Sequence, residues 1–174
     1  RAWASRGVPV QPVSYLGRDV PQVGGGTRPG AFGILHIEDE GFPEAELFAI
    51  HHETPEVLWQ EDLLVHPNGV EALLETAIVS AEPEQTRARL DRFGLPSGAP
   101  GIRVLTPAEA ELRYGGVAPP RIPCVLAATF GVSDLPATAA FLRRCGVTVE
   151  TVDGRLRVPA AEAEGCVLEF VEHR

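Results

Sequence analysis

The sequence predicts an α+β fold made of repeated βαβββ modules, with curved mixed sheets and helices on their outer faces. Three observations favour this fold. First, residues 77–95 and 129–147 align with each other without a gap. Second, two β-rich runs flank Asp153-Gly154, the residue pair that a two-residue type I′ hairpin turn needs. Third, residues 167–171 (VLEFV) have the composition of a closing strand.

The internal repeat predicts the same local structure twice. Each copy has a short apolar strand, then an acidic residue at the expected helix N-cap, Glu82 or Asp134. An amphipathic helix follows and stops at Gly94 or Gly146, because glycine adopts the positive φ that ends many helices. We therefore predict strands over 76–80 and 124–130 and a helix over 136–144. Chance similarity between two amphipathic helices is the alternative.

The repeat divides the chain into modules. Residues 1–70 are predicted to form an incomplete first βαβββ module, without its first strand and most of its helix, ending in the connector His66-Pro67-Asn68-Gly69. Its opening segment is predicted to be a final helical turn, a stop at Gly7 and strands near 10–16, 31–37 and 46–52. Residues 71–123 and 124–174 are predicted to be two related βα(β) repeats, the first with a hairpin over 101–114.

Composition limits the classes of partner. The chain has 174 residues, with 44% hydrophobic and 22% charged, which is ordinary for a globular protein and argues against disorder. A net charge of −9 argues against nucleic acid and anionic membranes as partners. Apolar runs fall short of the roughly 20 residues that span a bilayer. Three scattered cysteines fit no disulfide framework, so the cytoplasm is the default location. The absence of lysine is typical of GC-rich bacteria.

Two stretches resemble a known family. The run Phe48-Ala-Ile-His-His-Glu-Thr-Pro-Glu-Val-Leu-Trp59, followed by His66-Pro-Asn-Gly69, resembles a glyoxalase-like branch of the vicinal oxygen chelate superfamily, as does the ending from Arg157 to Phe170. The resemblance implies paired βαβββ modules and a metal site with ligands from two modules. It places ligand positions at Glu75 and Glu169. The equivalent of Glu75 in the last copy is Ala127, so the set is incomplete.

Six residues are candidates for a functional site. Taken with the resemblance, the sequence predicts His52 and Glu169 as metal ligands, Glu56 and Glu169 as catalytic carboxylates, and Trp59, His66 and Asn68 as ligand-binding residues. His52 ends a strand, where a side chain is held by the sheet and still reaches a loop-lined mouth.

Each of these candidates has a structural alternative. The His-His-Glu run is equally a polar strand end, Trp59 a buried or interface anchor, and His66–Gly69 a plain connecting turn. Glu169 alternates with Val167 and Val171. It is a buried ligand or base if this face is the concave inside of the curved sheet, and an ordinary surface charge if the face is exposed to solvent.

The resemblance implies a metal-assisted lyase, isomerase or dioxygenase acting on a small oxygenated organic molecule. Zn, Fe, Ni or Mn suits imidazole and carboxylate ligands, and a carboxylate would move the proton. The alternative is a non-catalytic protein that binds and sequesters a small molecule. A third hypothesis is a structural module that mediates dimerisation. Module pairing within the chain and module pairing between two chains are both open, and the second would give a homodimer.

Overall fold

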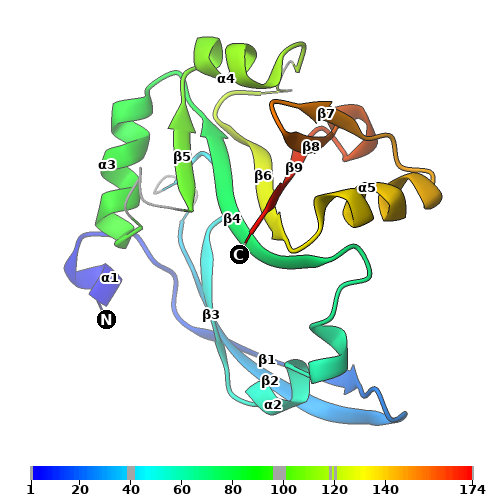
Figure 1. Ribbon diagram of the computed structural model, residues 1–174. Helices are drawn as coiled ribbons and strands as arrows, with labels where there is room; N and C mark the ends of the chain where they lie inside the picture. Colours follow the sequence, from blue (N-terminus) through cyan, green and yellow to red (C-terminus); the bar gives the residue numbers. More distant parts are fainter. Residues whose placement is uncertain (1, 39–41, 96–100, 118, 120, 174) are drawn as a thin grey trace. The chain divides into compact units, whose positions relative to one another are not determined.

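The computed structural model describes residues 2–38, 42–95, 101–117, 119 and 121–173 (Figure 1). The chain divides into two compact units, residues 1–65 and 66–174. Helices combined with parallel and antiparallel strands confirm the α+β class. No helix in the described part of the chain is long and apolar enough to cross a bilayer.

The first unit is built around a three-stranded antiparallel sheet in the order β1-β2-β3. Its elements are α1 (Ala2–Ser5), β1 (Ser14–Pro21), β2 (Thr27–His36), β3 (Phe48–His52), α2 (Pro55–Leu58) and a 3-10 turn, η2 (Glu61–Leu63). The short opening helix and the stop at Gly7, with φ of 70°, agree with the sequence prediction. The first strand begins later than predicted, because Pro9 and Pro12 have no N–H to donate to a ladder.

The second unit contains a six-stranded mixed sheet in the order β5-β4-β6-β9-β8-β7. Its elements are β4 (Val70–Val79), α3 (Pro83–Phe93), β5 (Ile102–Leu105), α4 (Pro107–Tyr114), β6 (Cys124–Val132), α5 (Leu135–Arg144), β7 (Glu150–Val152), β8 (Arg155–Val158), η3 (Ala160–Glu162) and β9 (Val167–Glu172). The two central strands, β4 and β6, are antiparallel, whereas β4 pairs with β5 and β6 with β9 in parallel.

The repeated strand–helix–glycine unit is present in both predicted copies. Helices α3 and α5 begin directly after Glu82 and Asp134, and are followed by Gly94 and Gly146 with φ of 75° and 80°. The Asp134 carboxylate accepts the N–H of Ala137 at 2.8 Å, which is a true N-terminal cap. In residues 124–174 the order β6-α5-β7-β8-β9 follows the βαβββ pattern.

The predicted hairpin at Asp153-Gly154 is also confirmed. These residues join β7 to antiparallel β8, and both have positive φ, 50° and 76°. A type I′ turn requires positive φ at both central residues, which aspartate and glycine tolerate. This turn sets the register that places Glu150 opposite Arg157.

The hairpin predicted over residues 101–114 is wrong. The structure has strand β5 followed by helix α4. The reason is a capping box: the Thr106 hydroxyl accepts the Glu109 N–H at 3.2 Å, and the Glu109 carboxylate accepts the Thr106 N–H at 2.7 Å. Pro107 at the first helical position adds to this start signal. The described sheet of this unit therefore has one strand, β5, where the predicted hairpin would have supplied two.

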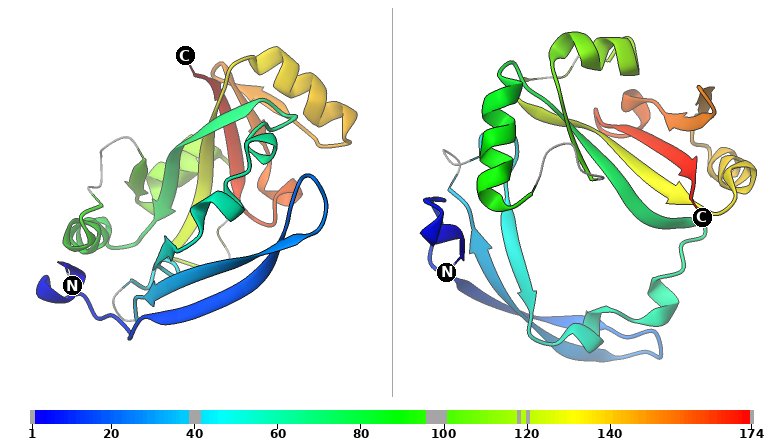
Figure 2. Two further views of the ribbon diagram at one scale, coloured as in Figure 1. Left: turned by 90° about the horizontal axis from the view of Figure 1, so that it is seen from below. Right: turned by 60° about the vertical axis from the view of Figure 1, so that its left-hand side comes forward.

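The two faces of the six-stranded sheet differ in chemistry. Phe170 and Leu156 pack with Leu142 of α5, which runs beside the sheet (Figure 2). Because side chains alternate between faces along a strand, Glu169 and Arg157 lie on the opposite face. The sheet therefore presents a polar row on the face turned away from α5.

Candidate functional site

A row of polar residues crosses five strands of the second unit's sheet. Glu75 on β4 pairs with Thr129 on β6, and Thr129 pairs with Glu169 on β9. Glu169 in turn pairs with Arg157 on β8, which pairs with Glu150 on β7. Directly paired residues lie side by side on one face of a sheet. The fold thus gathers residues from across the second unit into one polar row.

Glu169 is the buried centre of this row, with 1% of its side chain exposed. Arg157 Nη2 donates to Glu169 Oε1 at 2.9 Å. Arg113 Nη2, Arg155 Nη1 and the Thr129 hydroxyl lie 3.4, 3.6 and 3.4 Å from Oε2. A buried carboxylate is stable only when it is paired and hydrogen-bonded. Three guanidinium groups supply that pairing here.

Arg113, in the last turn of α4, ties this helix to the sheet. Its Nη2 lies 3.3 Å from Glu75 Oε1 and 3.4 Å from Glu169 Oε2, so it bridges the two carboxylates. Its Nε donates to the Tyr114 hydroxyl at 3.1 Å, and its carbonyl accepts from Arg157 Nη2 at 3.0 Å. The end of α4 is therefore held by several hydrogen bonds at once.

The electrostatics of the row keep Glu75 ionised and Tyr114 protonated at neutral pH. Burial raises the pKa of Glu75, but the hydrogen bond and charge of Arg103 and the charges of Arg113 and Arg155 outweigh it and hold the pKa below its usual value. Burial raises the pKa of Tyr114, and Arg113 opposes this only in part. Glu75 is therefore an anion held by arginines, and the Tyr114 hydroxyl keeps its proton.

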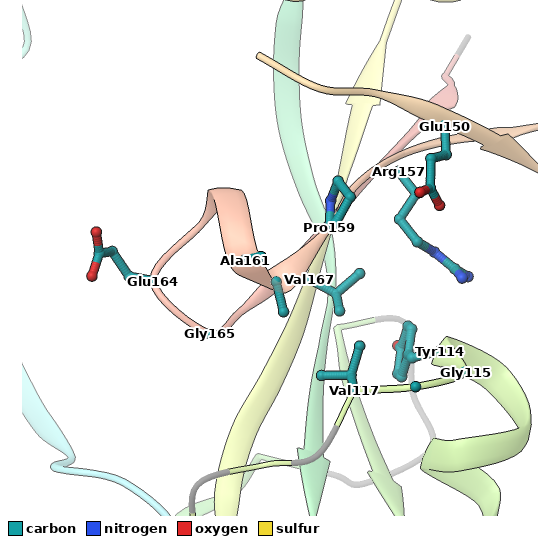
Figure 3. Close-up of a pocket in the computed structure, with 12 residues that line it drawn as sticks. Tyr114, Gly115, Val117, Glu150, Arg157, Pro159, Ala161, Glu164, Gly165 and Val167 are labelled. Atoms are coloured by element: carbon teal, nitrogen blue, oxygen red, sulfur yellow. The ribbon is translucent and has the colours of Figure 1, made fainter.

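A cavity of about 690 Å³ adjoins the Arg157 end of the row. Its apolar lining includes Tyr114, Val117, Pro159, Ala160 and Val167. Its charged lining comes from Glu150, Arg157 and Glu164. In Figure 3, Glu150 and Arg157 lie on the same side of the cavity, whereas the Glu164 carboxylate lies on the far side and points away. This size is within the usual range of small-molecule sites, roughly 300–1,000 Å³.

Arg157 retains hydrogen-bond donors beside this cavity. Its side chain is 12% exposed, and its Nη2 carries the bonds to Glu169 and to the Arg113 carbonyl. Its Nη1 has no acceptor among the described residues and is not fully buried, so it is the donor that a ligand in the cavity could reach, whereas Nε is fully buried without a hydrogen-bond partner in the described structure. Unpaired donors on a buried guanidinium are costly. An anion in the cavity would supply an acceptor.

In the first unit, the structure places the predicted residues His52, Glu56 and Trp59 around a small aromatic cluster. The half-buried His52 ring packs edge-on between Phe32 and Trp59, with centroids 5.5 and 5.7 Å away. Glu56 is exposed and lies 3.7 Å from Arg28. No hydrogen bond or ion pair joins His52 to Glu56 in the described chain. Trp59 remains 59% exposed.

A cavity of about 230 Å³ does lie beside the predicted segment, but it opens on the other face of β3. Its lining includes His51 and Glu53, whose Nδ1 and Oε1 atoms are 3.1 Å apart. The alternation along β3 agrees with the sequence prediction, and His51 instead of His52 faces this cavity.

The predicted ligand-binding residues His66 and Asn68 lie in a turn. The Gly69 N–H bonds to the His66 carbonyl at 2.8 Å, and Gly69 has φ of 76°. The Asn68 carbonyl accepts the Thr138 hydroxyl at 2.8 Å, which ties the turn to α5. His66 is exposed and Asn68 half-buried. These contacts agree with the connecting-turn alternative.

The described residues do not fit a divalent metal at Glu169. Both of its oxygens already contact guanidinium groups, and a cation placed there would be repelled by three like charges. Among the described residues, no three His, Cys, Asp or Glu side chains gather as they would around a metal ion.

Sequence reasoning missed the arginines that dominate this site. Arg113 was hidden because residues 101–114 were expected to form a hairpin. Arg157 and Arg155 alternate along β8, a signal that places both on one face. Glu75 and Glu169 were recognised as related positions, and the structure brings them together through Arg113.

Comparisons with known proteins add one structural likeness. The crystal structure of methylmalonyl-CoA epimerase from Mycobacterium tuberculosis matches with 19% sequence identity and a TM-score of 0.47. The match covers 63% of this chain and 93% of that one. No family model matches the chain, and a search of curated proteins gives no match. At this similarity, nothing about the activity of the epimerase is carried over to this chain.

Proposed function

We propose that residues 66–174 bind a small organic anion in the cavity beside Arg157, and that the chain is a small-molecule-binding protein built on a vicinal oxygen chelate-like module. Arg157 is the main support for this proposal. It lines the cavity, is almost buried, and has donors that no described residue satisfies. The Nη1 group of Arg157 can give a charge-assisted hydrogen bond to a carboxylate.

The charge balance of the site supports an anionic ligand. Arg103, Arg113, Arg155 and Arg157 contact the carboxylates of Glu75 and Glu169, and with Glu150 of the same row this makes four positive charges against three negative ones. The surplus of positive charge attracts an anion, although the protein as a whole is acidic. The local field therefore differs in sign from the overall charge.

The same contacts favour the binding alternative over the metal-assisted enzyme. A lyase, isomerase or dioxygenase of the predicted kind needs a carboxylate free to hold a metal or move a proton. Arginine contacts occupy Glu169 and Glu75. Neither carboxylate is free to take that role in this arrangement.

Calorimetric titration with isocaproate and with its neutral amide, isocaproamide, tests the proposal. Both probes have the same apolar body and differ in charge. We expect isocaproate to bind and isocaproamide to bind far more weakly, because Arg157 gains a charge-assisted hydrogen bond only from the carboxylate. EDTA should leave the binding of isocaproate unchanged.

A pair of variants distinguishes this cavity from a nonspecific surface. Ala161 is exposed at the cavity wall, so Ala161→Trp should fill the space without unfolding the protein and should abolish binding. Ala140, exposed on α5, provides the control Ala140→Trp, which should bind normally. Equal affinity for acid and amide, or loss of binding on chelation, would contradict the proposal, and the second result would support the metal-assisted enzyme.

A further inference from the structure

We infer that the ligand of this cavity is a zwitterion of the α-amino acid type with an apolar side chain. This inference rests on the proposed function, and it adds a second point of recognition. Arg157 would bind the carboxylate, and Glu150 would bind the ammonium group. Neither residue alone distinguishes an amino acid from a simple acid.

Glu150 is a carboxylate without a partner at the cavity wall. It lies on β7, is exposed, and lines the same cavity as Arg157. No hydrogen bond or ion pair links it to any other residue in the described ranges. A solvated surface carboxylate is common, so its position relative to Arg157 is the informative feature.

Glu150 and Arg157 occupy directly opposed positions on antiparallel β7 and β8, yet they do not form an ion pair. Opposite charges at paired positions usually interact across the strands. Here Arg157 is drawn instead to Glu169 on its other neighbouring strand and to the Arg113 carbonyl. The wall therefore holds a positive and a negative group next to each other, each with unused bonding capacity (Figure 3).

A ligand that carries both charges on adjacent groups fits this wall. The carboxylate and ammonium of an α-amino acid are attached to one carbon, so they can reach two residues that stand side by side on paired strands. A simple acid would satisfy Arg157 but would also meet the negative charge of Glu150, which repels it. A simple amine would meet Glu150 but also the positive charge of Arg157, which repels it.

The remaining lining fits an apolar side chain. Val117, Pro159 and Ala160 provide aliphatic surface, and the nearly buried Val167 and Tyr114 lie behind it. Polar groups that would recognise a sugar or a nucleotide base are few in this lining. Burial of an aliphatic side chain against such a surface is favourable by roughly 25 cal/mol per Å² of apolar area.

Isothermal titration with three probes of matched skeleton tests the inference: leucine, isocaproate (leucine without its amine) and isoamylamine (leucine without its carboxylate). We expect leucine to bind about tenfold more tightly than isocaproate, as one additional charge-assisted contact would give. Isoamylamine should show no measurable binding.

Two variants assign the preference to Glu150. Glu150→Gln should abolish the preference for leucine: leucine should bind more weakly, and isocaproate should bind as well as before or slightly better, because a negative charge beside its carboxylate is removed. Glu150 has no described partner, so this variant is expected to fold. Glu164→Gln is the matched control: Glu164 lines the same cavity but points away from it, so both affinities should stay as they are (Figure 3).

The outcomes separate this inference from the proposed function. Tight binding of isocaproate with no gain for leucine overturns the zwitterion and leaves the anion site standing. A gain for leucine that survives in Glu150→Gln overturns the role of Glu150. Failure of both isocaproate and leucine to bind overturns the proposed function together with the inference.

Discussion

Arg157 and Glu169 stand directly opposite each other on β8 and β9, and their side chains meet at 2.9 Å on the face of the sheet turned away from α5. Pairing of the two strands places these residues side by side, so the two charged side chains are close enough to interact. The pair is also joined to α4, because the same Arg157 nitrogen donates to the Arg113 carbonyl. A substitution of either residue will therefore alter contacts in both the sheet and helix α4.

Replacing Glu169 by glutamine should strongly destabilise the protein. The substitution leaves the guanidinium groups of Arg113, Arg155 and Arg157 close together without their shared carboxylate. Breaking a buried ion pair from one side costs about 3–5 kcal/mol. Denaturant unfolding measures the loss. Glu172→Gln, at an exposed position of the same strand, should change stability by less than about 0.5 kcal/mol. Similar small effects for both variants would show that Glu169 contributes no net stability.

Arg113→Lys should also destabilise, although the charge is kept. Lysine has no planar fork, so it cannot contact Glu75, Glu169 and the Tyr114 hydroxyl in the present geometry. We expect a loss of about 1–2 kcal/mol in the free energy of unfolding. Arg143→Lys on the exposed side of α5 is the control and should be neutral. An unchanged midpoint of denaturant unfolding for Arg113→Lys would mean that the positive charge alone, without the guanidinium geometry, stabilises the end of α4.

Thr106→Ala tests the capping box that begins α4. The variant loses the hydroxyl that accepts the Glu109 N–H. Loss of such a cap costs about 1 kcal/mol. Thr106→Ser keeps the hydroxyl and should retain most of the stability. Circular dichroism during denaturant unfolding compares the variants, and equal stability of alanine and serine at this position would contradict the prediction.

Glu75 should link the stability of the second unit to pH. Its pKa in the folded protein lies below the ordinary value of 4.5, so the unfolded chain takes up the proton first as the pH falls. The stabilisation is complete above that value and is lost as the pH falls through the lower, folded-state pKa. Glu75→Gln should be less stable than the parent protein at neutral pH. The difference in the free energy of unfolding between the two should disappear as the pH is lowered. Glu71→Gln, exposed on the same strand, should show no such dependence. A difference in unfolding free energy that stays constant from neutral to acidic pH would rule out this linkage.

His52→Phe should leave the first unit as stable as before or slightly more stable. The ring of His52 fills a space between Phe32 and Trp59, and its Nδ1 is buried without a hydrogen-bond partner in the described structure. Phenylalanine fills similar space without the unpaired nitrogen, whose burial costs about 1–3 kcal/mol. Calorimetric melting provides the measurement. A marked fall in the melting temperature would show that the imidazole makes a polar contact which the packing conceals.

The elements that local sequence signals specify were predictable, and those that depend on distant partners were not. Glu82, Asp134, Gly94 and Gly146 mark helix ends within a few residues, so both repeated helices were found. The type I′ turn was likewise predictable from the pair Asp153-Gly154 alone. The α4 helix is not predicted because the β-rich residues before it favour a strand, whereas the capping box from Thr106 to Glu109 decides for a helix.

The site was predictable only in part, for a physical reason. Strand alternation left open whether Glu169 faces the interior or the solvent, and only the sheet order β6-β9-β8 decides it. Its partner Arg113 is 56 residues away along the chain. A contact of that separation is set by tertiary packing, which leaves no periodic signal in either segment.

The division of the chain at residue 65 has a spectroscopic consequence. Both tryptophans, Trp3 and Trp59, lie in the first unit, and the two tyrosines, Tyr15 and Tyr114, are shared between the units. Tryptophan emission excited at its red edge therefore follows the first unit alone. Far-ultraviolet dichroism follows the helices and strands of both. Two unfolding curves recorded with these signals on one sample will coincide only if the units melt as a single cooperative block, and any offset between them measures their independence directly.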